Sequence, residues 1–304
     1  MTGLPGTGFL GIDHPLILVR NLDDAIARFA SIGFTMAPQS RHPWGTSTCI
    51  AIMERSLIEL VSIYDEEKLD LLPAGDFRFG RFVQQHLAER EGISLTALNS
   101  DDAEGDATAV ILRGVACQGT IAFGRDVIRH DGVPDRTSTT LKILASDDLP
   151  RLSHFICQQH RPDLIYVPKW SQHANGAQHY SQVTILAEEA DQPRVRSRLA
   201  QLYGSSAIFD LDDGFGARTG RGSYVVTDRR GIEARYGTLP PDLAAGTEPC
   251  YVAIHIKVDD IARAKAVLSA NGINHRALDG EIRLPDAGTF ANVFVNFTAS
   301  GAVV

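Results

Sequence analysis

The sequence predicts an α+β fold built from repeated modules, each a strand, a helix and then three more strands. In the first module the segment 12–19 is apolar and β-branched enough for a buried strand. Apolar residues then recur at helical spacing from Leu22 until Gly33, which ends the predicted helix. Three strands are expected after it, and their ranges are 34–37, 46–53 and 56–63.

Internal repetition is the second observation behind this fold class. Residues 258–264 align without gaps on residues 19–25, at the point where a strand passes into a helix. Four modules are expected in the 304 residues, giving two cupped mixed sheets. The prolines and the Asn-Gly pair within 161–179 mark a crossover, so we expect an N-terminal domain at 1–165 and a C-terminal domain at 166–304.

Composition excludes several classes of function. The net charge is -8, with no Lys/Arg cluster, so a nucleic-acid partner is not expected. The sequence contains no run of about 18 apolar residues, so no membrane span is expected. The first residues lack the basic and apolar regions of a signal peptide, and the four cysteines form no CxxC pair, so we expect a cytoplasmic protein with reduced thiols.

Two residues of the first module carry most of the chemical information. His14 lies near the start of the first predicted strand, and Glu59 lies between Ile58 and Leu60 on the last. A carboxylate is costly to bury without a partner. A divalent metal shared with His14 would satisfy it. The alternative is that Glu59 faces solvent on the outer side of the sheet, which strand parity does not exclude.

The module order and these two residues resemble the vicinal oxygen chelate superfamily, which includes the glyoxalases and the extradiol ring-cleaving dioxygenases. Three further stretches are similar to its glyoxalase-like branch: His42-Pro43-Trp44-Gly45-Thr46, Phe79-Gly80-Arg81-Phe82 and His173-Ala174-Asn175-Gly176-Ala177. The resemblance implies a glyoxalase/bleomycin resistance/dioxygenase-like fold of paired βαβββ modules. It also implies metal ligands on the first and last strands of a module, here His14 and Glu59.

The resemblance implies a metal-dependent enzyme of the isomerase or lyase type that acts on a small oxygen-bearing organic substrate. Zn, Ni, Mn or Fe would suit nitrogen and oxygen ligands, and Glu59 would be the catalytic base. One alternative is a metal-free protein that binds or sequesters a small molecule. The other is an extradiol-type dioxygenase, which the four-module layout resembles. A small-molecule substrate is the expected partner, and a homodimer is the candidate assembly.

Four other residues are predicted to contact the substrate. Trp44 is a candidate wall of the pocket, and Gln158 is the polar residue nearest to the place of a second glutamate. His173 stands in the family-like turn, although His154, His160 and His179 are also candidates to complete the site of His14. His255 is the C-terminal candidate, and Glu233 in a predicted strand at 231–236 echoes Glu59. A complete ligand triad is not expected in that half, since Ser181 or Gln182 stands near the position of a histidine, and the last strand offers Asn292 and Asn296 but no acid.

Overall fold

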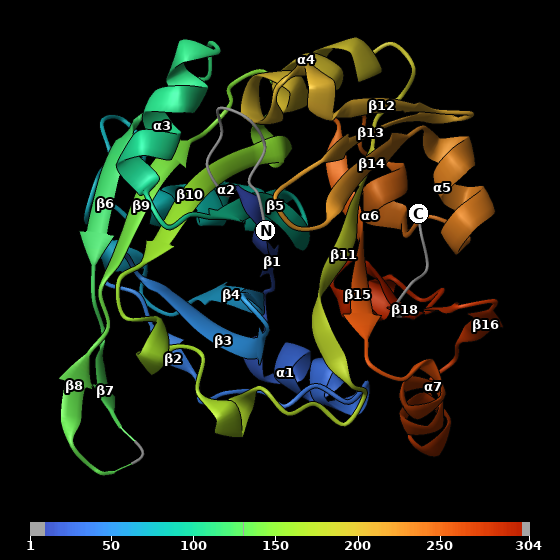
Figure 1. Ribbon diagram of the computed structural model, residues 1–304, viewed down its shortest axis with the longest axis horizontal. Helices are drawn as coiled ribbons and strands as arrows, with labels where there is room; N and C mark the ends of the chain where they lie inside the picture. Colours follow the sequence, from blue (N-terminus) through green and yellow to red (C-terminus); the bar gives the residue numbers. More distant parts are fainter. Residues whose placement is uncertain (1–9, 130, 300–304) are drawn as a thin grey trace.

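The computed structural model of the protein describes residues 10–129 and 131–299. Its strands form two eight-stranded mixed sheets and one separate two-stranded hairpin. The first residues of the chain, on which the expectation of no signal peptide rests, lie outside the described part. Figure 1 shows the N-terminal sheet, in blue and green, beside the C-terminal sheet, in yellow to red.

The first sheet has the strand order β2-β3-β4-β1-β5-β10-β9-β6. Its strands are β1 (Gly11–Leu18), β2 (Ser40–Arg41), β3 (Thr46–Met53), β4 (Ser56–Ile63), β5 (Gly92–Asn99), β6 (Gly119–Phe123), β9 (Thr139–Leu144) and β10 (Ser153–Gln159). β1 lies in the middle, parallel to β4 and antiparallel to β5. The hairpin of β7 (Asp126–Ile128) and β8 (Pro134–Arg136) projects from this half at the lower left of Figure 1.

The second sheet repeats the plan with the order β12-β13-β14-β11-β15-β18-β17-β16. Its strands are β11 (Ala177–Leu186), β12 (Ile208–Leu211), β13 (Gly214–Arg218), β14 (Ser223–Thr227), β15 (Cys250–Val258), β16 (Arg276–Leu278), β17 (Glu281–Arg283) and β18 (Phe294–Ala299). The central strands again pair parallel (β11 with β14) and antiparallel (β11 with β15).

All the described helices except α2 begin at side-chain caps or prolines that the sequence supplies. Their bounds are α1 (Leu22–Ser31), α2 (Phe79–Glu89), α3 (Ala103–Leu112), α4 (Gln192–Tyr203), α5 (Arg229–Tyr236), α6 (Pro241–Ala244) and α7 (Ile261–Ala270). The Asn21, Asp102 and Asp260 side chains cap α1, α3 and α7, the helices of three modules. None of the described helices is long and apolar enough to cross a membrane.

The two halves share one apolar core rather than meeting at a polar seam. A single cluster of buried residues takes members from both sheets and from α1, α3, α4 and α7. β11 lies between the two halves in Figure 1. Its Tyr180 hydroxyl donates to the Leu57 carbonyl of β4 at 2.8 Å. The domain boundary at 165/166 stays a prediction, and the strands of the two sheets lie on either side of it.

Two predicted strands are wrong. Residues 34–37 form no strand: Ala37 N–H bonds to Ile50, but Pro38 then lacks a donor to continue a ladder. Residues 231–236 form part of helix α5, because the Asp228 side chain caps its first turn and Gly237, at φ 110°, ends it. Glu233 is therefore an exposed helical residue, so its likeness to Glu59 was misleading. The glycine-rich stretch 214–222 begins with strand β13.

His173 holds the crossover against the first half. Its Nδ1 accepts from the Thr35 backbone N–H at 3.0 Å, and its Nε2 bonds to the Ile52 carbonyl at 2.9 Å. His173→Ala should lower the free energy of unfolding by about 1–3 kcal/mol, because two buried backbone groups lose a partner. Urea denaturation measures this loss, and His160→Ala, at an exposed histidine, should change stability by less than about 0.5 kcal/mol. A His173→Ala protein of unchanged stability but weaker ligand binding would contradict this role.

Candidate functional site

His14 and Glu59 meet on the concave face of the first sheet. β1 and β4 are paired in parallel, with Leu16 opposite Glu59. His14 Nε2 lies 2.9 Å from Glu59 Oε2, and both side chains are buried. The two residues are thus on neighbouring strands with their polar tips in contact, as the sequence predicts. The alternative of a solvent-facing Glu59 is wrong, since the residue is 7% exposed.

Neighbouring polar groups hold this pair in its ionised form. Burial disfavours charge on both residues. For His14 the nearby carboxylates of Asp13 and Glu59 outweigh burial and raise its pKa well above the usual range. For Glu59 the hydrogen bond and charge of His14 outweigh burial and lower its pKa. Thr48 Oγ1 also donates to Glu59 Oε1 at 2.7 Å, so both carboxylate oxygens have a partner.

His42 is a third polar residue of this site that the sequence analysis did not assign. Its Nε2 lies 3.8 Å from Glu59 Oε1, and its Nδ1 is 2.9 Å from Thr46 Oγ1. Burial lowers its pKa to about 4, so the ring is neutral near pH 7. The ring stacks on Trp44 at 4.7 Å between centroids. A signal was present, since His42 begins the stretch that carries the resemblance to the glyoxalase-like branch.

These side chains line a small cavity that is partly open to solvent. Most of the wall is apolar: Leu16, Trp44, Ile50, Leu57, Val61, Phe79, Phe123, Leu141, Phe155 and Ile165. The remaining lining residues are His14, His42, Glu59, Arg125, Thr139, Cys157 and Gln159. Of the residues predicted to contact substrate, Trp44 is the one that lies here.

Gln158 points away from the cavity because of strand parity. On β10 the residues that line the cavity are Phe155, Cys157 and Gln159, which share one face. Gln158 lies between them on the other face. Its amide accepts from the Ala103 N–H and donates to the Asp101 carbonyl at the start of α3. The expectation that Gln158 contacts substrate or metal beside His14 therefore receives no support from its position.

The other histidines of the crossover region also lie away from this cavity. His173 bonds to backbone on both sides, and burial lowers its pKa. His154 is buried elsewhere, against the Tyr251 hydroxyl at 3.0 Å. Neither residue lines the cavity. The histidine that lies beside Glu59 in the cavity is His42, from another part of the chain.

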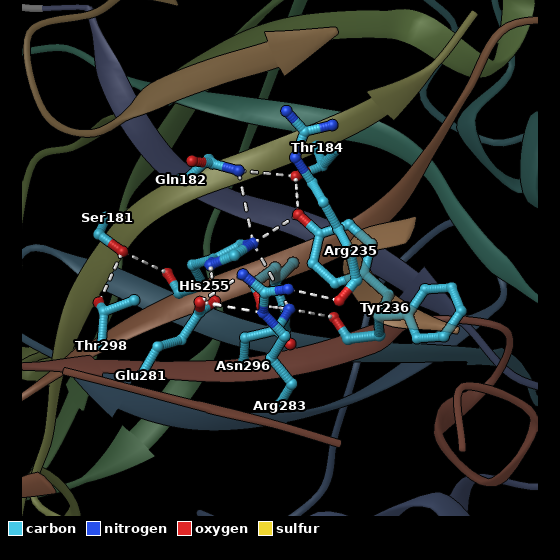
Figure 2. Close-up of polar contacts among 12 residues, drawn as sticks. Ser181, Gln182, Thr184, Arg235, Tyr236, His255, Glu281, Arg283, Asn296 and Thr298 are labelled. Carbon is cyan, nitrogen blue, oxygen red and sulfur yellow. Dashed lines mark hydrogen bonds and ion pairs between the residues drawn. The ribbon is translucent and has the colours of Figure 1, made fainter. Parts of the chain in front are cut away.

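His255 occupies the matching cup of the second sheet, which protein side chains fill (Figure 2). Its Nε2 is 2.8 Å from the Tyr236 hydroxyl, and its Nδ1 is 3.2 Å from Glu281 Oε1. Gln182 and Asn296 amides lie 3.4 and 3.5 Å from Nε2. Burial lowers the pKa of His255 even though Glu281 opposes this. Apolar residues of α5, α6 and the turn between them pack over this face: Ile232, Leu239 and Leu243.

The described residues do not fit a metal held by three protein side chains. Among them, no group of three or more His, Cys, Asp or Glu is arranged to hold an ion. His14 and Glu59 supply two donors, and both oxygens of Glu59 are engaged. In the second cup, Gln182 and Asn296 stand beside His255 where further histidine and carboxylate ligands would be needed.

Comparisons with known proteins agree with this fold. The chain is similar to a hypothetical protein from Staphylococcus aureus, with a TM-score of 0.67 and 13% identity over 96% of this chain and 100% of that one. It is also similar to a mutant of 4-hydroxymandelate synthase from Streptomyces coelicolor, with a TM-score of 0.57 and 11% identity over 98% and 94%. A xylose isomerase-like TIM barrel/4-hydroxyphenylpyruvate dioxygenase fusion protein gives 0.55 and 12%, over all of this chain and 51% of that one.

At these identities the structural likeness shows the fold alone. A search of curated proteins found no match. The profile of one family, described as a glyoxalase-like domain, matches residues 12–203, which is more than half of the chain. The chain therefore belongs to the family of proteins with this glyoxalase-like domain.

Proposed function

We propose that the cup of the first sheet is the working site, and that the protein is an enzyme of the isomerase or lyase type. Its substrate would be a small organic molecule that carries an oxygen group. The observation that supports this most is the contact between His14 Nε2 and Glu59 Oε2 at the wall of an apolar cavity. A protonated donor and a carboxylate side by side are suited to moving a proton beside a carbonyl group.

The chemistry that this pair can supply is enolisation. The Nε2–H of His14 would exchange its bond with Glu59 Oε2 for one to the carbonyl oxygen of the substrate, and the freed Glu59 oxygen would take a proton from the neighbouring carbon. The electrons of the broken C–H bond move onto the oxygen. Return of the proton to a different carbon gives isomerisation, and loss of a leaving group gives elimination. The apolar walls strengthen both interactions because they exclude water.

A metal-free binding protein is the second candidate, and one observation favours it. Both oxygens of Glu59 already accept a hydrogen bond, from His14 and from Thr48. A carboxylate engaged in this way can stabilise the cavity wall and orient a ligand without taking part in a reaction. The two candidates share the pocket and differ only in whether Glu59 moves a proton.

Metal dependence is the part of the sequence prediction that the donor set does not support. Divalent metals are common among superfamily members, and an extradiol-type dioxygenase would need one. Because the described residues supply no group of three ligands in either cup, the proposal routes no step through a metal. No feature of the described residues favours the dioxygenase alternative over the other two.

Deuterium exchange should separate the enzyme from the binding protein. In D2O, the wild-type protein should exchange a C–H proton next to the carbonyl of at least one compound in a panel of small oxo acids, ketones and aldehydes. Glu59→Gln should slow this exchange by about 100-fold or more, because general-base catalysis is lost. Proton NMR follows the exchange, and the same samples report ligand binding.

The matched control is Glu54→Gln, which changes an exposed glutamate in the turn between β3 and β4. It should leave exchange unchanged. Binding without exchange for every compound would favour the binding protein over the enzyme. Exchange that persists in Glu59→Gln would show that Glu59 is not the base.

Elemental analysis tests the metal. Protein made in medium supplemented with Zn, Ni, Mn or Fe, and purified without chelator, should hold well below one ion per chain, because three good protein ligands are the usual minimum for catalytic zinc. Occupancy near one per chain that disappears in both His14→Ala and Glu59→Gln would contradict this expectation and restore the metal-dependent interpretation.

A further inference from the structure

Arg125 brings a positive charge to the cavity from outside the sheet. It lies between β6 and β7, where the hairpin begins, and its side chain lines the cavity. Its backbone is fixed by two hydrogen bonds with Thr137, at 2.8 and 2.9 Å. Its Nη1 donates to Ser40 Oγ on β2. Thr137 therefore anchors the backbone of Arg125, and Ser40 holds its guanidinium at the cavity wall.

Among the described residues, no carboxylate forms an ion pair with this guanidinium. Glu59 raises the pKa of Arg125 from a longer distance, against the stronger lowering by burial. Both Glu59 oxygens are already taken by His14 and Thr48. Arginine stays charged under all ordinary conditions. The cavity wall thus holds a half-buried cation whose partner is missing, and such a charge is costly unless an anion or solvent offsets it.

The walls near Arg125 are suited to a ring. Phe123, two residues before it, packs edge-on against Trp44 at 4.9 Å, and Trp44 contacts Phe79 at 4.9 Å. Aromatic side chains favour offset or edge-to-face contacts with a further ring. Trp44 adds a polar feature: its indole N–H is buried and has no hydrogen-bond partner among the described residues. A ligand with an acceptor oxygen would satisfy it.

We propose that this pocket takes a small aromatic carboxylate, with its ring among Trp44, Phe79 and Phe123 and its carboxylate on Arg125. The inference rests on the proposed function of the first cup and names the class of molecule that enters it. A planar carboxylate matches the two-pronged donor geometry of arginine. A phosphate ester would match it too, but its second negative charge would lie near the carboxylate of Glu59. The monoanion is therefore favoured.

Three probes of similar size test the charge. Phenylacetate is the carboxylate, phenylacetamide is its neutral analogue, and phenyl phosphate is the dianion. In calorimetric or NMR titrations the wild-type protein should bind phenylacetate about 10- to 100-fold more tightly than phenylacetamide, as expected for a charge-assisted pair. Phenyl phosphate should bind more weakly than phenylacetate.

Arg125→Gln should bring the ratio of the two affinities close to one, while the affinity for phenylacetamide changes little. That second value shows that the cavity is intact. Arg136→Gln is the matched control, because it removes an exposed arginine from the same hairpin, paired there with Asp126. It should keep the full preference for phenylacetate. Arg125→Lys should restore part of the preference, since it returns the charge without the fork.

Several outcomes would overturn the inference while leaving the proposed site in place. They are equal binding of acid and amide by the wild type, a preference that survives Arg125→Gln, an equal loss in Arg136→Gln, and tighter binding of phenyl phosphate. Failure of the proposed site itself looks different. Leu141→Phe narrows the cavity, and Leu112→Phe, on the surface of α3, does not. Binding that is unaffected by Leu141→Phe would overturn both proposals, whereas no binding of any of the three aromatic probes would overturn this inference alone.

Discussion

The buried charge of Glu59 is the constraint on which the arrangement of the first half depends. A carboxylate between apolar neighbours on β4 is stable only where donors face it, and the parallel pairing of β1 with β4 brings His14 to that place. Thr48, on the other neighbouring strand, supplies the second donor. The adjacent strands β3, β4 and β1 thus meet at one buried polar contact.

The two cups show how one fold gives different interiors. In each half, helices follow the last strand of the first of its two modules. In the first half α2 follows β4, and in the second half α5 and α6 follow β14. In the first half, Phe79 at the start of α2 lines the cavity and leaves space beside it. In the second, Tyr236 at the end of α5 reaches His255, and its hydroxyl bonds to that ring (Figure 2). A protein side chain therefore occupies the region where a ligand could approach His255.

Sequence reasoning was most successful where periodicity and caps are local. It anticipated β1, α1, β3 and β4, and with them the meeting of His14 and Glu59. It failed at residues 231–236, where the likeness to the segment around Glu59 suggested a strand but Asp228 and Gly237 set the ends of a helix. At Gln158 the error was one of parity, since a shift of one residue moves a side chain to the other face. His42 and Arg125 come from loops beside the sheet, and their position depends on tertiary contacts that no spacing rule encodes.

Arg125 comes from the base of a hairpin, whereas His14 and Glu59 come from the sheet, and this difference affects how the ligand preference can evolve. The sheet provides the shape of the cavity and its His14–Glu59 pair, and most of the apolar wall belongs to a cluster of buried residues within the first half. The hairpin base provides the extra charge, and the hairpin itself projects into solvent (Figure 1). Substitutions there leave the packing of the core untouched. Related proteins can therefore differ in whether their ligand is anionic, neutral or cationic through changes in this loop alone. Such changes need no compensating substitutions in the core.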